Sequence, residues 1–180
     1  LSRRDAVAGA AEWIGCVEAH ARGTKGLVAT TGQVTVEPGA ANVIAGRCRV
    51  TVDIRHADDR VRMPAVERLR AAAQEIGARR RLQVEWKSRL DQLSTAMDPS
   101  LIAMLARALE AAGAPMTVMS SGAGHDAMVL APYMPAAMLF IRTPGGISHH
   151  PDESVDENDV AIALAAGANF LNELAASVSV

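Results

Sequence analysis

Residues 47–55, RCRVTVDIR, alternate strictly between apolar and polar side chains. One face carries a cysteine, two valines and an isoleucine, and the other carries three arginines, a threonine and an aspartate. A period of two over nine residues is typical of a strand in an antiparallel sheet that is covered on one face only. We therefore expect a sheet with an apolar face under helices and an arginine-bearing face opposite.

The flanking sequence extends this pattern on both sides. Apolar residues recur at helical spacing over residues 7–17, and residues 27–37 have strand character up to the Pro38-Gly39 turn. After residue 55, a helical stripe follows Pro64 at a first-turn position, and residues 82–87 alternate again. The order α-β-β-α-β lacks only the first strand of the ferredoxin-like plan β-α-β-β-α-β. Residues 1–90 are predicted to form such a domain.

The second half has a different pattern. Asp98-Pro99 predicts the start of a helix, residues 116–119 and 137–141 are apolar runs typical of buried strands, and Ser154-x-x-Glu157 is a capping box for a last helix. This α-β-α-β-α series belongs to an α/β sheet. Two strands and three helices cannot cover both faces of such a sheet, so residues 91–180 are predicted to be part of a larger α/β domain.

Composition and charge narrow the class of protein. The 180 residues are 49% apolar and 3% aromatic, with a net charge of −2. Residues 1–90 have a net charge of +6, and residues 91–180 have one of −8. Such an uneven distribution of charge is typical of a protein that binds nucleic acid or a small anionic substrate, or of two domains that attract each other. Because aromatic residues and lysine-rich runs are lacking, we expect no nucleic-acid partner.

No apolar run is long enough for a membrane span, and the two cysteines are expected to be reduced thiols in the cytoplasm.

Two polar turns follow the apolar runs of the second half, where ligands gather in α/β sheets. The first contains His125-Asp126 and the second contains His149-His150 and Glu153. Imidazoles and carboxylates at one sheet edge suit a divalent metal or acid–base chemistry. The alternatives are a helix cap with a solvated histidine at 125 and ordinary loop histidines at 149 and 150.

The residues of the first half have structural interpretations as well. Arg55 is typical of a solvated strand face on which arginines pair with Asp53, and Asn42 is typical of a turn. Cys48 is predicted to be a core strand residue. The sequence contains no Walker A loop, no strand-linked G-x-G-x-x-G, no G-x-S-x-G and no C-x-x-C.

Three stretches together resemble one family. They are VEPGAANVI at 36–44 with DIR at 53–55, SGAGHDA at 121–127, and GISHHPDE at 146–153. In order, spacing and context they are similar to the hydantoinase/carbamoylase-type amidases, which include N-carbamoyl-L-amino-acid hydrolase and allantoate amidohydrolase. The resemblance covers essentially the whole chain.

The resemblance implies a fold and a set of roles. Residues 1–90 would be most of a ferredoxin-like lid or dimerisation domain, and residues 91–180 would be the C-terminal part of a metallopeptidase-like catalytic domain. His149 matches a ligand of a centre with two divalent ions, zinc or manganese. Asn42 and Arg55 match lid residues that hold the substrate carboxylate, with a reach into the neighbouring subunit of a homodimer. Gly124 and His125 match a turn that contacts the substrate.

The resemblance also sets limits. His150 and Glu153 match the motif and are expected to support the site without binding metal. Ala45 stands where the family usually has proline. The other metal ligands, the acidic general base and the lid histidine have no match in this chain, so we expect a C-terminal fragment without catalytic residues of its own.

The implied reaction is hydrolysis of a linear C–N amide of an N-carbamoyl-L-amino acid or a ureido acid such as allantoate. One alternative is an aminoacylase-like or dipeptidase-like metallopeptidase. The other is a dimerisation or binding module without catalysis.

Overall fold

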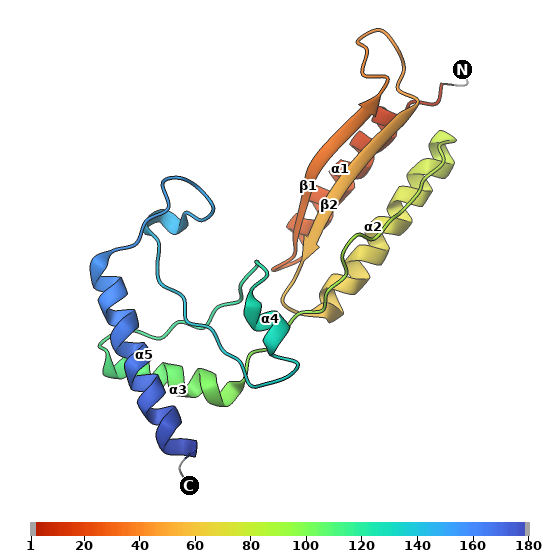
Figure 1. The fold of residues 1–180 in the computed structure, drawn as a ribbon. Coiled ribbons are helices and arrows are strands. Elements are labelled where there is room, and N and C mark those ends of the chain that lie inside the picture. Colours follow the sequence, from red (N-terminus) through yellow and green to blue (C-terminus); the bar gives the residue numbers. More distant parts are fainter. Residues whose placement is uncertain (1–2, 179–180) are drawn as a thin grey trace. The chain divides into compact units, whose positions relative to one another are not determined.

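A computed structural model describes residues 3–178, which fall into two compact units divided between Ser94 and Thr95. Each unit has its own elements (Figure 1). The first unit contains helix α1 (Ala6–Gly23), strands β1 (Val28–Glu37) and β2 (Arg47–Arg55), and helix α2 (Asp59–Arg80).

β1 and β2 form an antiparallel hairpin in which Val28 lies opposite Arg55 and Glu37 lies opposite Arg47. A bulge at Gly32 shifts the register once, and the strand continues on both sides of it. The alternation expected for β2 is confirmed, because its four apolar residues are half-buried while its three arginines are exposed. Burial raises the pKa of the Cys48 thiol on this inner face.

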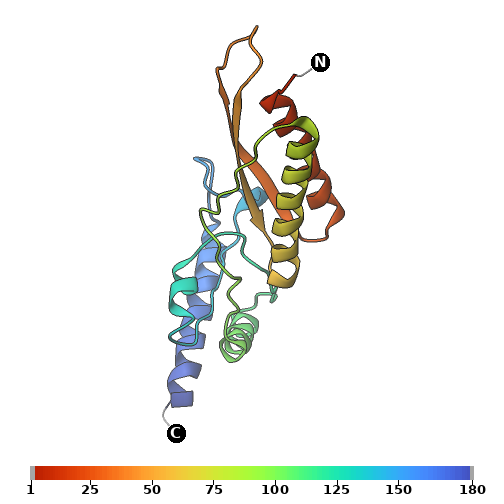
Figure 2. The same ribbon diagram turned by 90° about the vertical axis from the view of Figure 1, so that its right-hand side faces the viewer.

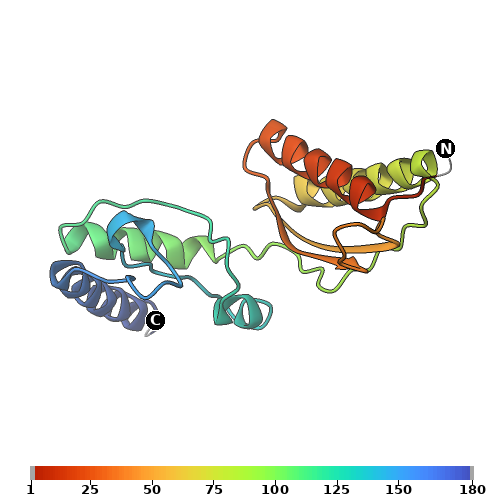
Figure 3. The same cartoon turned by 90° about the horizontal axis from the view of Figure 1, so that it is seen from above.

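Helices α1 and α2 cover one face of the hairpin (Figures 2 and 3). The arginines of β2 are exposed and alternate with the apolar residues that face the helices. The core between the two layers consists of Trp13, Val17, Leu69 and Ile76, with β2 residues packed against it. The indole Nε1 of Trp13 donates a hydrogen bond to the backbone oxygen of Leu69 at 2.8 Å and joins the two helices.

The start of α2 differs from the prediction. The helix begins at Asp59, capped by the Asp58 carboxylate, which accepts the backbone N–H of Arg60 at 2.9 Å. Pro64 therefore lies inside the helix, after its first turn, and not at its first-turn position. Because the Asp58 carboxylate caps a free backbone N–H group, the helix begins five residues before Pro64, where the sequence pattern had indicated its start.

The predicted strand at residues 82–87 is wrong, because the described residues form no strand there. The segment nevertheless packs on the helices through alternate side chains. Val84 lies against Gly77, and Trp86 meets Trp13 edge-on with ring centroids 5.9 Å apart. The alternation thus correctly indicated which side chains face the core, while the residues that the structure describes supply no neighbouring strand for the backbone.

The end of this unit is tied to the first turn of α2. Asp59 accepts hydrogen bonds from the backbone N–H and the hydroxyl of Ser94, at 2.7 and 3.0 Å. Arg62 donates to Asp59 at 2.7 Å and to Asp91 at 2.8 Å. These contacts fasten the exit segment to α2 up to the last residue of the unit.

The second unit contains α3 (Pro99–Ala111), the short helix α4 (Asp126–Leu130), the single 3-10 turn η1 (Pro144–Gly146) and α5 (Glu157–Val178). Asp98 caps α3 as predicted, since its carboxylate accepts the N–H groups of Ser100 and Leu101. α3 and α5 cross and pack (Figure 1) through small residues, with Ala108 and Ala166 fully buried.

The two strands predicted for this unit are also wrong. Residues 116–119 and 137–141 have no regular secondary structure, and no strand is present among residues 95–178. Many of their apolar side chains face solvent; Val118, for example, is 69% exposed. A buried parallel sheet needs neighbours on both sides of each strand, and the described residues of this unit do not supply them.

The predicted capping box at Ser154 is wrong as well. α5 begins at Glu157, and the Asp156 carboxylate accepts the N–H of Asn158 at 2.8 Å. An aspartate directly before the helix replaces the serine as the capping group.

One stretch of α5, Glu157–Ser177, is long and apolar enough to cross a membrane by length and composition alone, and 6% of it is buried. The helix also makes polar contacts within the unit. Glu173 forms an ion pair with Arg107, and the Asn169 amide donates to the backbone oxygen of Ala108. Such contacts are typical of a helix that packs against protein, because polar groups in lipid carry a large free-energy cost.

Candidate functional site

The five site residues predicted from the sequence are divided between the two units. Asn42 and Arg55 belong to the first unit, and Gly124, His125 and His149 belong to the second. The geometry of the candidate residues is therefore defined separately within each unit.

Arg55 is the last residue of β2 and lies on the arginine-bearing face. Its Nε and Nη2 donate to the two carboxylate oxygens of Asp53, at 2.6 and 2.7 Å. This hydrogen bonding lowers the pKa of Asp53 and raises that of Arg55. The side chains of Arg55 and Asp53 are both about half exposed, so the guanidinium is in contact with solvent. A planar guanidinium suits such two-point recognition.

Asn42 lies in the loop between the strands, at the opposite end of the hairpin from Arg55 (Figure 1). β2 has nine residues, and a rise of about 3.3 Å per residue separates its ends by roughly 26 Å. A carboxylate measures only a few ångströms. Asn42 and Arg55 of one chain therefore do not meet at a single carboxylate.

His125 occupies the N-cap position of α4, where its side chain makes no capping hydrogen bond. The ring is held from two sides instead. Its Nε2 lies 2.6 Å from the Ser121 hydroxyl, and its edge contacts the Phe140 ring, with centroids 5.6 Å apart. Ser121 also accepts the backbone N–H of Ala123. Gly124 precedes this ordered imidazole, and a Cβ there would meet Met128 at an ordinary contact distance.

His149 lies in the loop between η1 and α5 with a backbone φ of 57°. A residue with a Cβ rarely adopts this left-handed conformation, which is a feature of many functional sites. The carboxylate of Glu153 accepts the His149 backbone N–H at 2.8 Å. The neighbouring His150 directs Nδ1 toward the backbone N–H of Asp152, at 3.2 Å. Glu153 thus contacts the backbone of His149 and leaves its imidazole exposed.

The metal-donor set in this chain is incomplete. Within residues 3–178, no three side chains of histidine, cysteine, aspartate or glutamate converge as a metal site would require. The exposed imidazole of His149 is a suitable single donor for a divalent ion. The described residues alone do not fit a centre of two metals.

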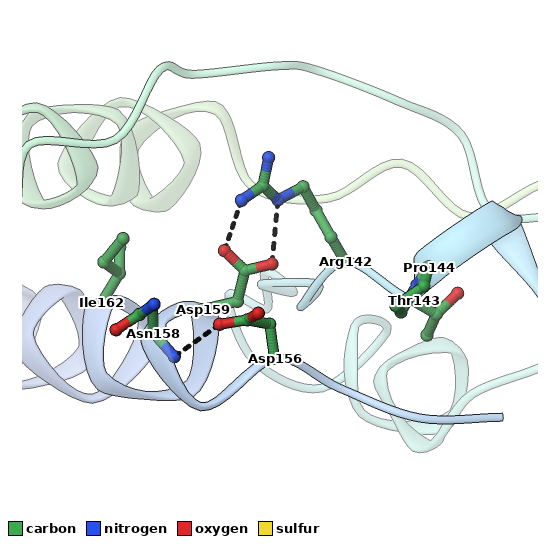
Figure 4. A pocket seen from close by; sticks show the side chains of 7 residues that line it. All are labelled: Arg142, Thr143, Pro144, Asp156, Asn158, Asp159 and Ile162. Carbon is green, nitrogen blue, oxygen red and sulfur yellow. Dashed lines mark hydrogen bonds and ion pairs between the residues drawn. The ribbon is translucent and has the colours of Figure 1, made fainter.

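Sequence reasoning missed three side chains that shape these turns. Ser121 fixes the ring of His125, while Arg142 and Asp159 form an ion pair on either side of the His149 loop (Figure 4). Hydroxyls in glycine-rich turns and ion pairs between distant residues give no periodic signal. A serine four residues before a histidine was the one available clue.

Comparison with known proteins places these observations in a family. Residues 5–173 match peptidase family M20/M25/M40. The probable allantoate deiminase of Oryza sativa subsp. japonica is 39% identical over 163 residues, which are 82% of this chain and 32% of the relative. The N-carbamoyl-L-amino acid amidohydrolase of Geobacillus stearothermophilus is 34% identical over 161 residues, which are 89% of this chain and 39% of the relative.

Solved structures of related proteins are also similar to this chain. A hydantoinase/carbamoylase family amidase from Burkholderia multivorans has a TM-score of 0.81 and 35% identity, covering 94% of this chain and 40% of its own. A Bacillus subtilis protein described as a dinuclear metal-binding peptidase of family M20 shares the fold, with a TM-score of 0.69 at 20% identity over 97% of this chain and 46% of its own.

The chain spans about a third of the length of the curated relatives it matches. The resemblance to hydantoinase/carbamoylase-type amidases that three motifs indicated is confirmed. With a mixed helix and strand content and a metallopeptidase-like fold, the chain belongs to peptidase family M20/M25/M40.

Proposed function

We propose that this chain is the lid domain and the C-terminal part of the catalytic domain of a metal-dependent amidohydrolase. Its substrate is an N-carbamoyl-L-amino acid or a ureido acid such as allantoate, and the reaction cleaves a linear C–N amide bond. The observation that carries the proposal is the half-exposed Arg55 guanidinium on the face opposite the helices. The relatives with these names support the substrate class.

The roles of the site residues follow from their chemistry. Arg55 binds the substrate carboxylate through two parallel hydrogen bonds and exchanges Asp53 for it. His125 and Gly124 contact the substrate amide, with the ring of His125 pre-oriented by Ser121. The positive charge of the first unit attracts the anionic substrate.

His149 is proposed to hold one of two divalent ions, zinc or manganese. The donors in the described residues do not complete such a centre, so the proposed centre needs further ligands. His150 and Glu153 support the loop without binding metal. This fragment alone is proposed to be inactive.

The first unit is proposed to be a ferredoxin-like lid. Residues 82–87 present alternate side chains to the same helices as β2, yet among the described residues the segment forms no strand. One added strand between β2 and this segment would pair both backbones and complete a sheet of four strands.

A homodimer explains the separation of Asn42 and Arg55. If each active site takes Arg55 from one subunit and Asn42 from its partner, two distant ends of the same hairpin serve two sites. A site built in this way is complete only in the dimer. We further propose a cytoplasmic enzyme without a nucleic-acid or membrane partner.

The substrate proposal is tested with the full-length protein, loaded with zinc or manganese, on a panel of N-carbamoyl-L-amino acids, allantoate, N-acetyl amino acids and dipeptides. We expect turnover of the carbamoyl or ureido compounds and its loss in Arg55→Ala and His149→Ala. Preferred turnover of acetyl amino acids or dipeptides would instead identify an aminoacylase-like or dipeptidase-like enzyme. A lack of turnover throughout the panel would favour a dimerisation module.

The shared site is tested by mixing two inactive variants. In a heterodimer of Asn42→Ala and Arg55→Ala subunits, one site keeps both residues and the other loses both. Random pairing makes half of the molecules heterodimers, so about a quarter of the wild-type activity should return. If both residues came from the same subunit, every site would lack one of them and the mixture would stay inactive.

A further inference from the structure

The loop that carries His149, which spans residues 143–156 and includes η1, has an unusual backbone. Gly145 and Gly146 have φ values of 69° and 67°, and His149 has one of 57°. The two glycines adopt this conformation without steric cost, whereas a histidine does so only where its surroundings hold it. The structure must therefore contain contacts that hold this loop in shape.

One set of contacts lies inside the loop. The Glu153 carboxylate accepts the His149 backbone N–H at 2.8 Å, and the Glu153 backbone N–H donates to the oxygen of His150 at 2.9 Å. These two hydrogen bonds close a tight turn around residues 149–153. They fix the turn locally and do not tie it to the rest of the unit.

The second contact lies at the base of the loop. Arg142 directly precedes the loop, and Asp159 lies in the first turn of α5 that follows it. The Arg142 guanidinium binds both oxygens of the Asp159 carboxylate, with an Nε–Oδ2 distance of 3.0 Å (Figure 4). Asp159 is only 14% exposed, so one partner of this ion pair is held firmly within the unit.

Little else holds the base of the loop. A surface hollow of about 500 Å³ lies between residues 142–144 and the start of α5. It is lined by Arg142, Thr143, Pro144, Asp156, Asn158, Asp159 and Ile162. In the described part of the chain, no second hydrogen bond or ion pair links residues 136–144 to the first turn of α5. An exposed ion pair is usually worth little, and the Arg142 side chain is 82% exposed, but its partner Asp159 is largely buried.

We infer that Arg142 and Asp159 are positioning residues for His149. Their paired hydrogen bonds close the base of the loop, and Glu153 then fixes the left-handed backbone that presents the imidazole. The inference rests on the proposed function, in which His149 is a metal donor.

The test uses the full-length protein and the variants Arg142→Gln and Asp159→Asn. The control is Arg107→Gln, which breaks the ion pair with Glu173 between α3 and α5, away from the loop. Hydrogen–deuterium exchange of residues 145–153 should be several-fold faster in both loop variants and unchanged in the control. Affinity for zinc, measured by chelator competition, should fall about tenfold, as for other groups that orient metal ligands.

A double-mutant cycle separates a paired role from two independent ones. If the two side chains act through each other, Arg142→Gln/Asp159→Asn should show no faster exchange than either single variant. Additive effects, wild-type exchange in Arg142→Gln, or equal acceleration in Arg107→Gln would each overturn the inference.

His149→Ala distinguishes this inference from the proposed function. If His149→Ala loses zinc while Arg142→Gln exchanges and binds zinc as the wild type does, the positioning role is wrong and the proposed function stands. If His149→Ala keeps wild-type zinc affinity, the metal assignment is wrong, and the inference fails with it.

Discussion

Arg55 and Asp53 lie two residues apart on the same face of β2 and are joined by two hydrogen bonds of 2.6 and 2.7 Å. The pairing matches the structural interpretation of this strand face and is compatible with substrate binding. A half-exposed ion pair contributes at most about 1 kcal/mol, so in the proposed function a substrate carboxylate would displace Asp53 at little cost. In the structure, the two hydrogen bonds to Asp53 hold the guanidinium in a fixed orientation.

Replacement of Asp53 should strengthen substrate binding. In Asp53→Asn, the substrate no longer competes with a carboxylate for Arg55, and we expect KM to fall by about two- to threefold. The control Glu18→Gln makes the same charge change in an exposed pair with Arg22 on α1 and should leave KM unchanged. Steady-state kinetics on the full-length enzyme measure both, and a rise of KM in Asp53→Asn would show that Asp53 mainly orients Arg55.

The contact between Ser121 and His125 should matter for turnover. In Ser121→Ala the imidazole loses its 2.6 Å partner, its orientation broadens, and kcat/KM should fall by roughly tenfold. Ser120→Ala removes the neighbouring hydroxyl, which has no such contact, and serves as the control. Equal effects of the two variants would mean that the turn, and not the ring of His125, is what the hydroxyl supports.

Acid should weaken the first unit through Asp58. Hydrogen bonds from Arg60, first from its side chain and then from its backbone, lower the pKa of Asp58 from 3.8 to about 2. Because the pKa is lower in the folded protein, the charged form contributes stability that is complete above pH 3.8 and is lost as the pH falls to about 2. Asparagine also caps helices but does not titrate in this range. Urea unfolding between pH 5 and 2 should therefore show a shallower loss of stability in Asp58→Asn, and equal slopes would contradict this role.

The period of two in β2 predicted its position and its buried face because both depend on residues within the strand. The same period at residues 82–87 correctly predicted that Val84 and Trp86 face the helices. It could not predict pairing, which requires hydrogen-bonding groups from another strand. The two apolar runs of the second unit, residues 116–119 and 137–141, failed as strands for the same reason.

The candidate site shows a similar division. His125 and His149 were found because their motifs are local in sequence. The pairing of Arg142 with Asp159 was missed because it depends on where α5 begins, and the capping box indicated a wrong start for that helix. The distance between Asn42 and Arg55 could have been calculated, since a strand of nine residues separates whatever lies at its two ends.

Two glycines in the first unit provide a stability test of how residues 82–87 pack. A Cβ on Gly77 would lie 2.5 Å from Val84 Cγ2 and 3.1 Å from the Leu82 backbone oxygen, whereas a Cβ on Gly15 would meet nothing within 4 Å. Both glycines lie inside helices, where alanine is intrinsically favoured by about 0.5–1 kcal/mol. Gly15→Ala should therefore raise the free energy of unfolding by about that amount. Gly77→Ala should lower it by about 1–3 kcal/mol, because the added methyl group forces the segment away from α2. Urea unfolding followed by tryptophan fluorescence measures both. Similar stabilisation in the two variants would show that residues 82–87 do not pack on α2 in solution.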